Sequence, residues 1–290
     1  MPQLRAAGPL SKAAVQREIQ AELFSFERKD VLTKSYPAKN HVIICEGDSW
    51  FNHPFLTDLP EQLRNFGYSV LHSNRPGKRL KESLDEAYFL APLRPGDTRK
   101  PQIKALLLSG GGNDLITWKK GNAEFSPIFR AAQSNDPTDY IDAVNLRQAL
   151  ADVTGWLGGI ATKLQRVDAG KLPVLLHCYD YITPKKYGPS PFKGTWINRQ
   201  LDAIGAENSV SFRKQITAEL QRPWIMAYKA ICVRFGWQFV GTQSLVQGRW
   251  HDEIHPNNHA MYDLAREYWD VLHQLRILPS RRFTELAKAA

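Results

Sequence analysis

Short apolar runs recur along the chain and alternate with longer amphipathic stretches. Each run is five or six residues long and is largely free of charged residues, as in strands that are buried on both faces of a parallel sheet. The five runs are residues 41–45 (HVIIC), 68–72 (YSVLH), 103–108 (IKALLL), 173–178 (PVLLHC) and 237–241 (WQFVG). The pattern therefore predicts five buried strands.

The amphipathic stretches between these runs predict helices. They cover residues 56–66, 80–90, 140–166, 210–235 and 258–275. Pro223 interrupts the fourth stretch, which predicts either one kinked helix or two helices. Asn257 or Asn258 is the expected N-cap of the last helix. Alternation of this kind predicts an α/β fold, a three-layer α/β/α sandwich on a five-stranded, mostly parallel sheet.

We expect one domain over residues 41–278, with an N-terminal helical extension at 1–40 and a tail at 279–290. Two segments, 115–139 and 180–208, are longer than a simple crossover needs and are predicted to be insertions. They lie where ligands bind in such folds, over one end of the sheet. Their aromatic residues are Trp118, Phe125, Tyr187, Phe192 and Trp196.

Composition changes this picture little. The 290 residues are 43% hydrophobic and 23% charged, as in an ordinary soluble protein. The formal net charge of +9 would suit nucleic acid or an anionic surface. Basic and acidic residues are interleaved, however, and no nucleic-acid-binding motif is present. We therefore expect no nucleic-acid partner and no more than weak contact with anionic surfaces.

The cysteines and the N-terminal segment bear on localisation. Cys45, Cys178 and Cys232 are widely spaced, so they form neither a disulfide framework nor a CxxC metal pair. The first forty residues lack the apolar core of a signal peptide, and no apolar stretch is long enough to span a bilayer. We expect a soluble protein without a transmembrane segment, cytoplasmic or exported without a cleavable signal peptide.

Two motifs follow predicted strands. Gly47-Asp48-Ser49 comes after the first strand, where a serine hydroxyl would stand at the strand's carboxyl end beside unpaired backbone N–H groups. Gly110-Gly111-Gly112-Asn113 follows the third strand, and the Asn113 amide could donate to a developing oxyanion. Taken alone, the first motif more often caps a helix and the second more often forms a turn.

A third motif, Asp252-Glu253-Ile254-His255-Pro256, precedes the last helix. An acid three residues before a histidine can hold Nδ1–H and leave Nε2 free to accept a proton from a serine. His251, His255 and His259 are also spaced as metal ligands on one helix, but Pro256 keeps His255 out of a helix. We expect no metal and no cofactor. Asp48 is the rival orienting acid, although its side chain should point away from Ser49.

The order of the three motifs resembles the conserved blocks of the SGNH/GDSL hydrolase superfamily, over residues 41–275. The resemblance implies a flavodoxin-like sheet order and serine esterase or lipase activity (EC 3.1.1.-) through an acyl-serine intermediate. It makes Ser49 the nucleophile, His255 the base and Asp252 its orienting acid. The Ser49 N–H, the Gly77 N–H and the Asn113 amide would form the oxyanion hole.

The chain departs from the family pattern at two places. Trp50 stands where the family has leucine, and Arg75 and Pro76 precede Gly77 in place of small polar residues. Trp50 and Phe51 are candidates for the substrate pocket. The alternatives within the family are a lipase or phospholipase and a carbohydrate O-acetylesterase. A catalytically idle protein that binds a ligand or an anionic surface is the alternative from another class.

Overall fold

Five parallel strands form one sheet in the computed structural model, which describes residues 41–72, 74–93, 102–118, 126–167, 169–184 and 196–279. The strands are β1 (His41–Glu46), β2 (Ser69–His72), β3 (Gln102–Leu108), β4 (Val174–His177) and β5 (Gln238–Val240). All five predicted strands are confirmed to within two residues at each end. The predicted extension at 1–40, and all but one residue of the predicted tail, lie outside the described residues.

The strand order is β2-β1-β3-β4-β5, and every neighbouring pair is parallel. This is the flavodoxin-like order, in which ligands bind where the chain reverses direction across the sheet, at the carboxyl ends of the first and third strands. Leu106, Leu107 and Leu108 of β3 have no solvent exposure because helices cover both faces of the sheet. The predicted three-layer α/β/α fold is confirmed.

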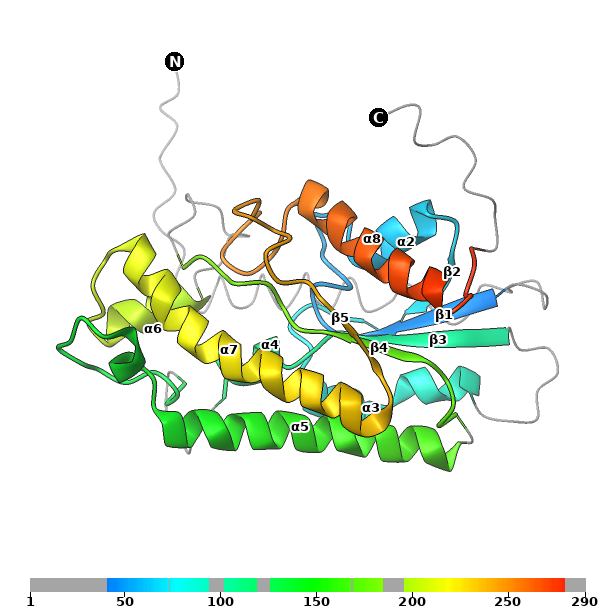
Figure 1. The fold of residues 1–290 in the computed structure, drawn as a ribbon, viewed down its shortest axis with the longest axis horizontal. Coiled ribbons are helices and arrows are strands. Elements are labelled where there is room, and N and C mark those ends of the chain that lie inside the picture. Colours follow the sequence, from blue (N-terminus) through cyan, green and yellow to red (C-terminus); the bar gives the residue numbers. More distant parts are fainter. Residues whose placement is uncertain are drawn as a thin grey trace, which may run out of the picture. The chain divides into compact units, whose positions relative to one another are not determined.

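Helices pack on both faces of this sheet (Figure 1). The two on one face, which contact each other, are α2 (Leu59–Asn65) and α8 (Asn258–Gln274). The principal helices on the other face are α3 (Leu80–Glu86), α5 (Ala143–Arg166) and α7 (Val210–Phe235), and α5 contacts both of the others. The shorter elements are α4 (Gly112–Ile116), α6 (Trp196–Ala203) and the 3₁₀ turns η1 (Tyr88–Leu93) and η2 (Pro137–Tyr140).

Local sequence signals account for most helix boundaries. The Asn257 side chain accepts a hydrogen bond from Ala260 N and caps α8, as expected for an asparagine before a helix. Asp142 caps α5 in the same way through Val144 N and Asn145 N. Pro223 does not divide α7, which runs as one helix of 26 residues and ends at Gly236 in a left-handed conformation.

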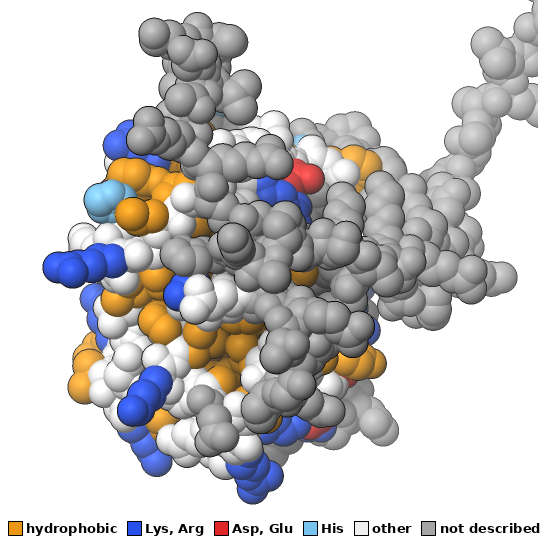
Figure 2. Space-filling model, turned by 90° about the vertical axis from the view of Figure 1, so that its right-hand side faces the viewer, with side chains coloured by type: hydrophobic (Ala, Val, Ile, Leu, Met, Phe, Trp, Pro, Cys, Tyr) orange, Lys and Arg blue, Asp and Glu red, His pale blue; other side chains and the backbone are white. Residues whose placement is uncertain are grey.

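The charged side chains on one face of the protein are scattered, like those in the sequence. On the face shown in Figure 2, Lys and Arg side chains stand apart, separated by apolar and uncharged groups. Among the helices that the structure describes, each is too short or too polar to cross a lipid bilayer.

Candidate active site

Ser49 lies just beyond the carboxyl end of β1. Gly47 makes this position possible, because a Cβ on it would lie 2.5 Å from the Ser109 carbonyl oxygen at the end of β3. After Gly47 the backbone turns sharply, and the N–H groups of Phe51 and Asn52 both donate to the Asp48 carbonyl at 3.0 Å. The Ser49 side chain is thereby held at the edge of the sheet and is largely buried.

His255 reaches Ser49 from a loop between β5 and α8, 206 residues further along the chain. The loop is closed by a short antiparallel bridge between Trp250 and Pro256 and by a 2.8 Å hydrogen bond from His251 N to His255 O. His255 Nε2 lies 2.7 Å from Ser49 Oγ. This is hydrogen-bond distance for a histidine that accepts the proton of a serine.

Asp252 holds the other side of the same imidazole. Its Oδ2 lies 2.7 Å from His255 Nδ1, and its Oδ1 accepts from the backbone N–H groups of Ile254 and His255 at 2.9 and 2.8 Å. Burial raises the pKa of Asp252, but the hydrogen bond and charge of His255, together with the two backbone N–H groups, outweigh burial, so the pKa lies below its ordinary value. An ionised Asp252 selects the tautomer with hydrogen on Nδ1, which leaves Nε2 free to accept from Ser49.

Asn113 approaches from the third strand's end. It lies in the first turn of α4, two residues after Gly111, whose φ of +93° makes the sharp turn out of β3. One amide hydrogen of Asn113 is used, because Nδ2 donates to the Lys78 carbonyl at 3.1 Å. The amide has a second hydrogen, and Asn113 lines the same cavity as Ser49. Gly77 has a φ of +72° but is exposed and does not line this cavity.

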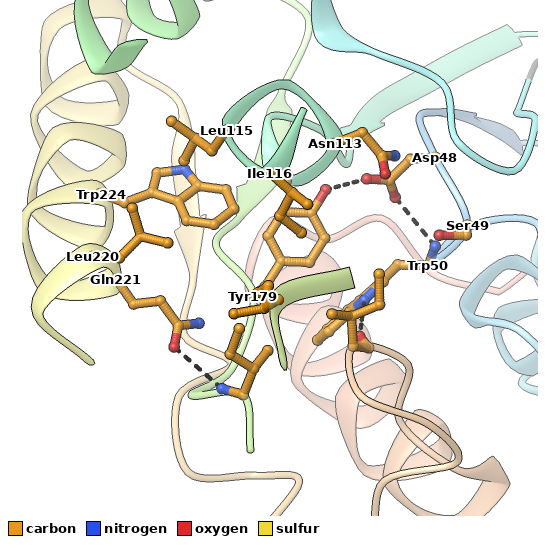
Figure 3. Close-up of a pocket in the computed structure, with 14 residues that line it drawn as sticks. Asp48, Ser49, Trp50, Asn113, Leu115, Ile116, Tyr179, Leu220, Gln221 and Trp224 are labelled. Atoms are coloured by element: carbon orange, nitrogen blue, oxygen red, sulfur yellow. Dashed lines mark hydrogen bonds between the residues drawn. The ribbon is translucent and has the colours of Figure 1, made fainter. Parts of the chain in front are cut away.

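The cavity beside Ser49 lies between the end of the sheet and α7 (Figure 3). Tyr179 stands in the centre of its wall, with its hydroxyl turned toward Asp48, and Leu220 and Trp224 project from α7. Most of the other lining residues are apolar: Trp50, Leu115, Ile116, Ile182, Ile197 and Ile254. Both predicted insertions contribute to this wall, the first through Leu115 and Ile116 and the second through Ile182 and Ile197.

The two residues predicted to form the substrate pocket, Trp50 and Phe51, lie in different surroundings. Trp50 lines the cavity, and its indole nitrogen donates to the Ile254 carbonyl at 3.0 Å. Phe51 lies in the core instead, edge-on to the rings of His177 and Tyr268. Trp50, directly after Ser49, therefore faces the cavity, and Phe51 faces the core.

Asp48, the rival acid, is buried and engaged elsewhere. Its carboxylate accepts hydrogen bonds from Trp50 N, Ser109 Oγ and the Tyr179 hydroxyl. Burial raises its pKa, and these hydrogen bonds only partly offset that effect. His255 has its carboxylate partner in Asp252, so the geometry favours Asp252 as the orienting acid.

The metal alternative finds little support in the described part of the chain. The one group there that could hold a metal is His53, Asp252 and His255, and it does not include His259. Asp252 and His255 already bind each other. His53 Nδ1 accepts from the Phe55 N–H at 3.2 Å, which requires a lone pair on Nδ1 and so places the neutral ring's hydrogen on Nε2. That tautomer leaves His53 no second nitrogen for a metal.

Several residues that shape the site were not identified from the sequence. Tyr179, Leu220 and Trp224 carry no motif, and only packing brings them to Ser49. Of the aromatic residues predicted in the insertions, Trp196 lies edge-on to the His255 ring at 5.5 Å, and Trp118 donates to Asp152 on α5 at 3.1 Å. Phe125, Tyr187 and Phe192 lie outside the described residues.

No family model and no curated protein matches this chain. Solved structures do. A Streptococcus pneumonia protein, described in connection with platelet activating factor, aligns with a TM-score of 0.51 and 13% identity over 90% of this chain and 100% of its own.

Two further solved structures are an extracellular lipase from Streptomyces rimosus and Axe2, an acetylxylan esterase from Geobacillus stearothermophilus. The lipase has a TM-score of 0.45 and 14% identity, over 81% of this chain and 99% of its own. Axe2 also has a TM-score of 0.45 and 14% identity, over 85% of this chain and 100% of its own. At 13% identity the first likeness shows the fold alone.

Proposed function

We propose that this chain is a serine ester hydrolase of the SGNH/GDSL type. The observation that carries the proposal is the continuous contact from Asp252 through His255 to Ser49, with two distances of 2.7 Å. Asn113, an amide donor, lines the same cavity as Ser49. Nucleophile, base, orienting acid and oxyanion donor thus meet at the carboxyl edge of the sheet, in the roles that the sequence motifs suggested.

In this mechanism His255 takes the proton of Ser49 as the hydroxyl oxygen attacks the ester carbonyl. Asp252 stabilises the imidazolium that forms. The tetrahedral oxyanion accepts hydrogen bonds from the Ser49 N–H and the Asn113 amide. The Gly77 N–H, the third donor that the sequence predicts, does not line this cavity. His255 then protonates the leaving alcohol, and water releases the acyl group from Ser49 by the reverse sequence.

The cavity favours an apolar acyl group. Its polar side chains are mostly engaged with the protein, since Gln221 accepts from Ile182 N at 3.1 Å and donates to the Asp180 carbonyl at 2.7 Å. Tyr179 donates to Asp48. The buried indole N–H of Trp224 is the exception and has no hydrogen-bond partner. Burial of a hydrocarbon chain against such a wall is favourable, whereas the wall provides few hydrogen-bonding groups for a sugar.

The position of His255 decides which half of the ester enters the cavity. The leaving alcohol must take its proton from His255 Nε2, so the alcohol departs on the His255 side of Ser49. His255 does not line the cavity, whereas Asn113 and Gly112 do. We therefore assign the cavity to the acyl group and the opposite side to the alcohol.

Ser49→Ala tests the proposal directly. The variant should lose turnover of p-nitrophenyl esters and labelling by a fluorophosphonate probe while it keeps its circular dichroism spectrum. Ser211→Ala, which changes an exposed serine on α7, is the matched control and should behave as the wild type. If Ser49→Ala keeps its turnover, the serine mechanism is wrong. A wild type that turns over no ester would favour the catalytically idle alternative.

Leu220→Ala tests the acyl assignment separately. With p-nitrophenyl esters of increasing chain length, the wild type should prefer an alkyl chain longer than acetyl, and this variant should move the preference to longer chains. Met226→Ala, on the exposed side of the same helix, should leave the profile unchanged. Ester turnover that is highest for acetyl and is unaffected by Leu220→Ala would refute the apolar acyl pocket but not the hydrolase.

A further inference from the structure

A buried ion pair lies next to the candidate site. Lys78 Nζ is 2.7 Å from Glu46 Oε1, and the two side chains are only 3% and 1% exposed. Glu86 Oε2, on α3, is 3.3 Å from the same ammonium group. Lysine and glutamate are almost never buried this deeply unless they are paired, and the mechanism above uses neither.

The pair joins the two halves of the site. Glu46 is the last residue of β1, three positions before Ser49. The backbone carbonyl of Lys78 accepts the hydrogen bond from Asn113 Nδ2 at 3.1 Å. Lys78 therefore contacts the last residue of β1 with its side chain and the Asn113 amide with its backbone carbonyl.

A second contact fastens the segment that contains Lys78 to α4. Asp114, the neighbour of Asn113, accepts a hydrogen bond from Leu80 N at 2.8 Å. The segment before Lys78 is also held by the residue that follows β1, because Arg75 N donates to the Gly47 carbonyl at 3.3 Å. The segment from Arg75 to Leu80, which contains Lys78, is therefore held at both of its ends.

The direction of the Asn113 amide depends on the Lys78 carbonyl. An asparagine amide rotates about its terminal bond, and its two N–H groups point about 120° apart. When one hydrogen is bound to the Lys78 carbonyl, the other has a defined direction. A carbonyl that moved by a fraction of an ångström would let the amide turn, and an oxyanion donor loses its effect when it is misplaced.

We propose that Lys78 is a positioning residue for the oxyanion hole, whose ion pair with Glu46 holds the carbonyl that orients the Asn113 amide. This inference rests on the proposed function. Stability alone accounts poorly for the pair, because apolar replacement of both members of a buried ion pair is often neutral or stabilising.

The experiment removes both charges together. Lys78→Met with Glu46→Gln keeps similar side-chain shapes and leaves no unpaired charge on either residue. Ester turnover should show a kcat about 10- to 100-fold lower, part of the loss expected when an oxyanion donor is removed. KM should stay within about threefold, since the donor acts mainly in the transition state. The exposed pair Lys81→Met with Asp85→Asn is the control and should leave kcat unchanged.

A double-mutant cycle separates positioning from general loss of structure. In an Asn113→Ala background there is no amide to orient, so the same double substitution should change kcat by less than about threefold. An equal loss of kcat in both backgrounds, or no loss in the native background, would overturn the proposal. Glu46→Gln alone, which leaves Lys78 paired with Glu86, is the variant to use if the double substitution does not fold, and the same cycle applies to it. Failure of the proposed function itself would appear as turnover that survives Ser49→Ala.

Discussion

Gly111 shows how one residue can set the geometry of the whole site. Its φ of +93° belongs to the left-handed region, and a Cβ there would lie 2.1 Å from the Tyr228 hydroxyl oxygen. That hydroxyl donates to the Gly110 carbonyl at 2.7 Å, so it has little freedom to move away. The turn that places Asn113 beside Ser49 therefore requires glycine for both conformation and space.

Gly111→Ala should lower the free energy of unfolding by several kcal/mol, on the order of 3 or more, because steric overlap adds to backbone strain. Gly155→Ala is the matched control. It lies inside α5, with nothing within 4 Å of an added Cβ, and should stabilise by about 0.5–1 kcal/mol. Urea unfolding of the two variants measures both values. Equal effects would mean that the Gly111 turn relaxes freely.

Asp252→Asn tests the orienting acid. An asparagine at this position can favour the wrong histidine tautomer, so kcat should fall steeply, by up to about 10⁴-fold if chymotrypsin-type behaviour transfers. Asp270→Asn, an exposed change on α8, should have no effect. Asp48→Asn disturbs the turn under Ser49 but not the His255 contact, so kcat should fall less. Steady-state kinetics of the three variants would disprove the assignment if Asp48→Asn caused the larger loss.

At the scale of elements, α6 is attached by one carboxylate to the loop that carries Asp252 and His255. Glu253 Oε2 accepts from Ile197 N at 2.8 Å, and Oε1 accepts from Asn198 N at 2.6 Å. These are the free N–H groups of the first turn of α6, which a local capping residue normally satisfies. Through this contact the residue next to Asp252 holds Ile197 in the cavity wall.

Glu253 should make stability depend on pH. Burial raises its pKa to about 7, although the helix N–H groups lower it. The native state therefore binds a proton that the unfolded chain has already released between pH 4.5 and 7. Glu253 makes the free energy of unfolding fall as pH rises through this window, by on the order of 3 kcal/mol at most.

In Glu253→Gln the free energy of unfolding should depend less on pH between 4.5 and 7. The exposed substitution Glu207→Gln should leave the dependence as in the wild type. Chemical denaturation of the wild type and both variants at several pH values between 4 and 8 measures the difference. If the free energy of unfolding of Glu253→Gln declined as steeply with pH as that of the wild type, the Glu253 carboxyl group would not be the cause of the decline.

At the scale of the whole molecule, all three cysteines are buried and unpaired. Burial raises the pKa of the Cys45 and Cys178 thiols well above the usual range and that of Cys232 to about 12. A thiol held in this state does not form the thiolate that reacts with electrophiles. The sequence prediction of no disulfide framework agrees with these positions.

A thiol reagent such as Ellman's should therefore react slowly with the native protein and with three thiols per chain after unfolding in guanidinium chloride. At a reagent concentration high enough for labelling to outpace reclosing, the rate of native labelling should match the rate of unfolding, because opening of the core is needed. Rapid labelling of one thiol in the native protein would show that its burial is only transient.

The sequence alone predicted the fold and the main candidate residues, because the signals for both are local. Apolar runs such as residues 103–108 mark buried strands, and Asn257 marks the start of the last helix. Ser49, Asn113 and His255 could be proposed because the order of their motifs, after the first and third strands and before the last helix, resembles that of the SGNH/GDSL superfamily. Parallel strands bring their carboxyl ends to one edge, so residues at those ends were expected to meet.

Only the tertiary structure decided which side chains touch. No local pattern could pair Lys78 with Glu46, or Glu253 with the start of α6, since these partners are 32 and about 55 residues apart. The sequence likewise favoured Asp252 over Asp48 without showing their contacts, and in the structure the Asp252 carboxylate lies on the imidazole of His255 while that of Asp48 accepts from Ser109. Local sequence determines where strands and helices begin and end, whereas contacts between distant segments depend on how the assembled layers pack.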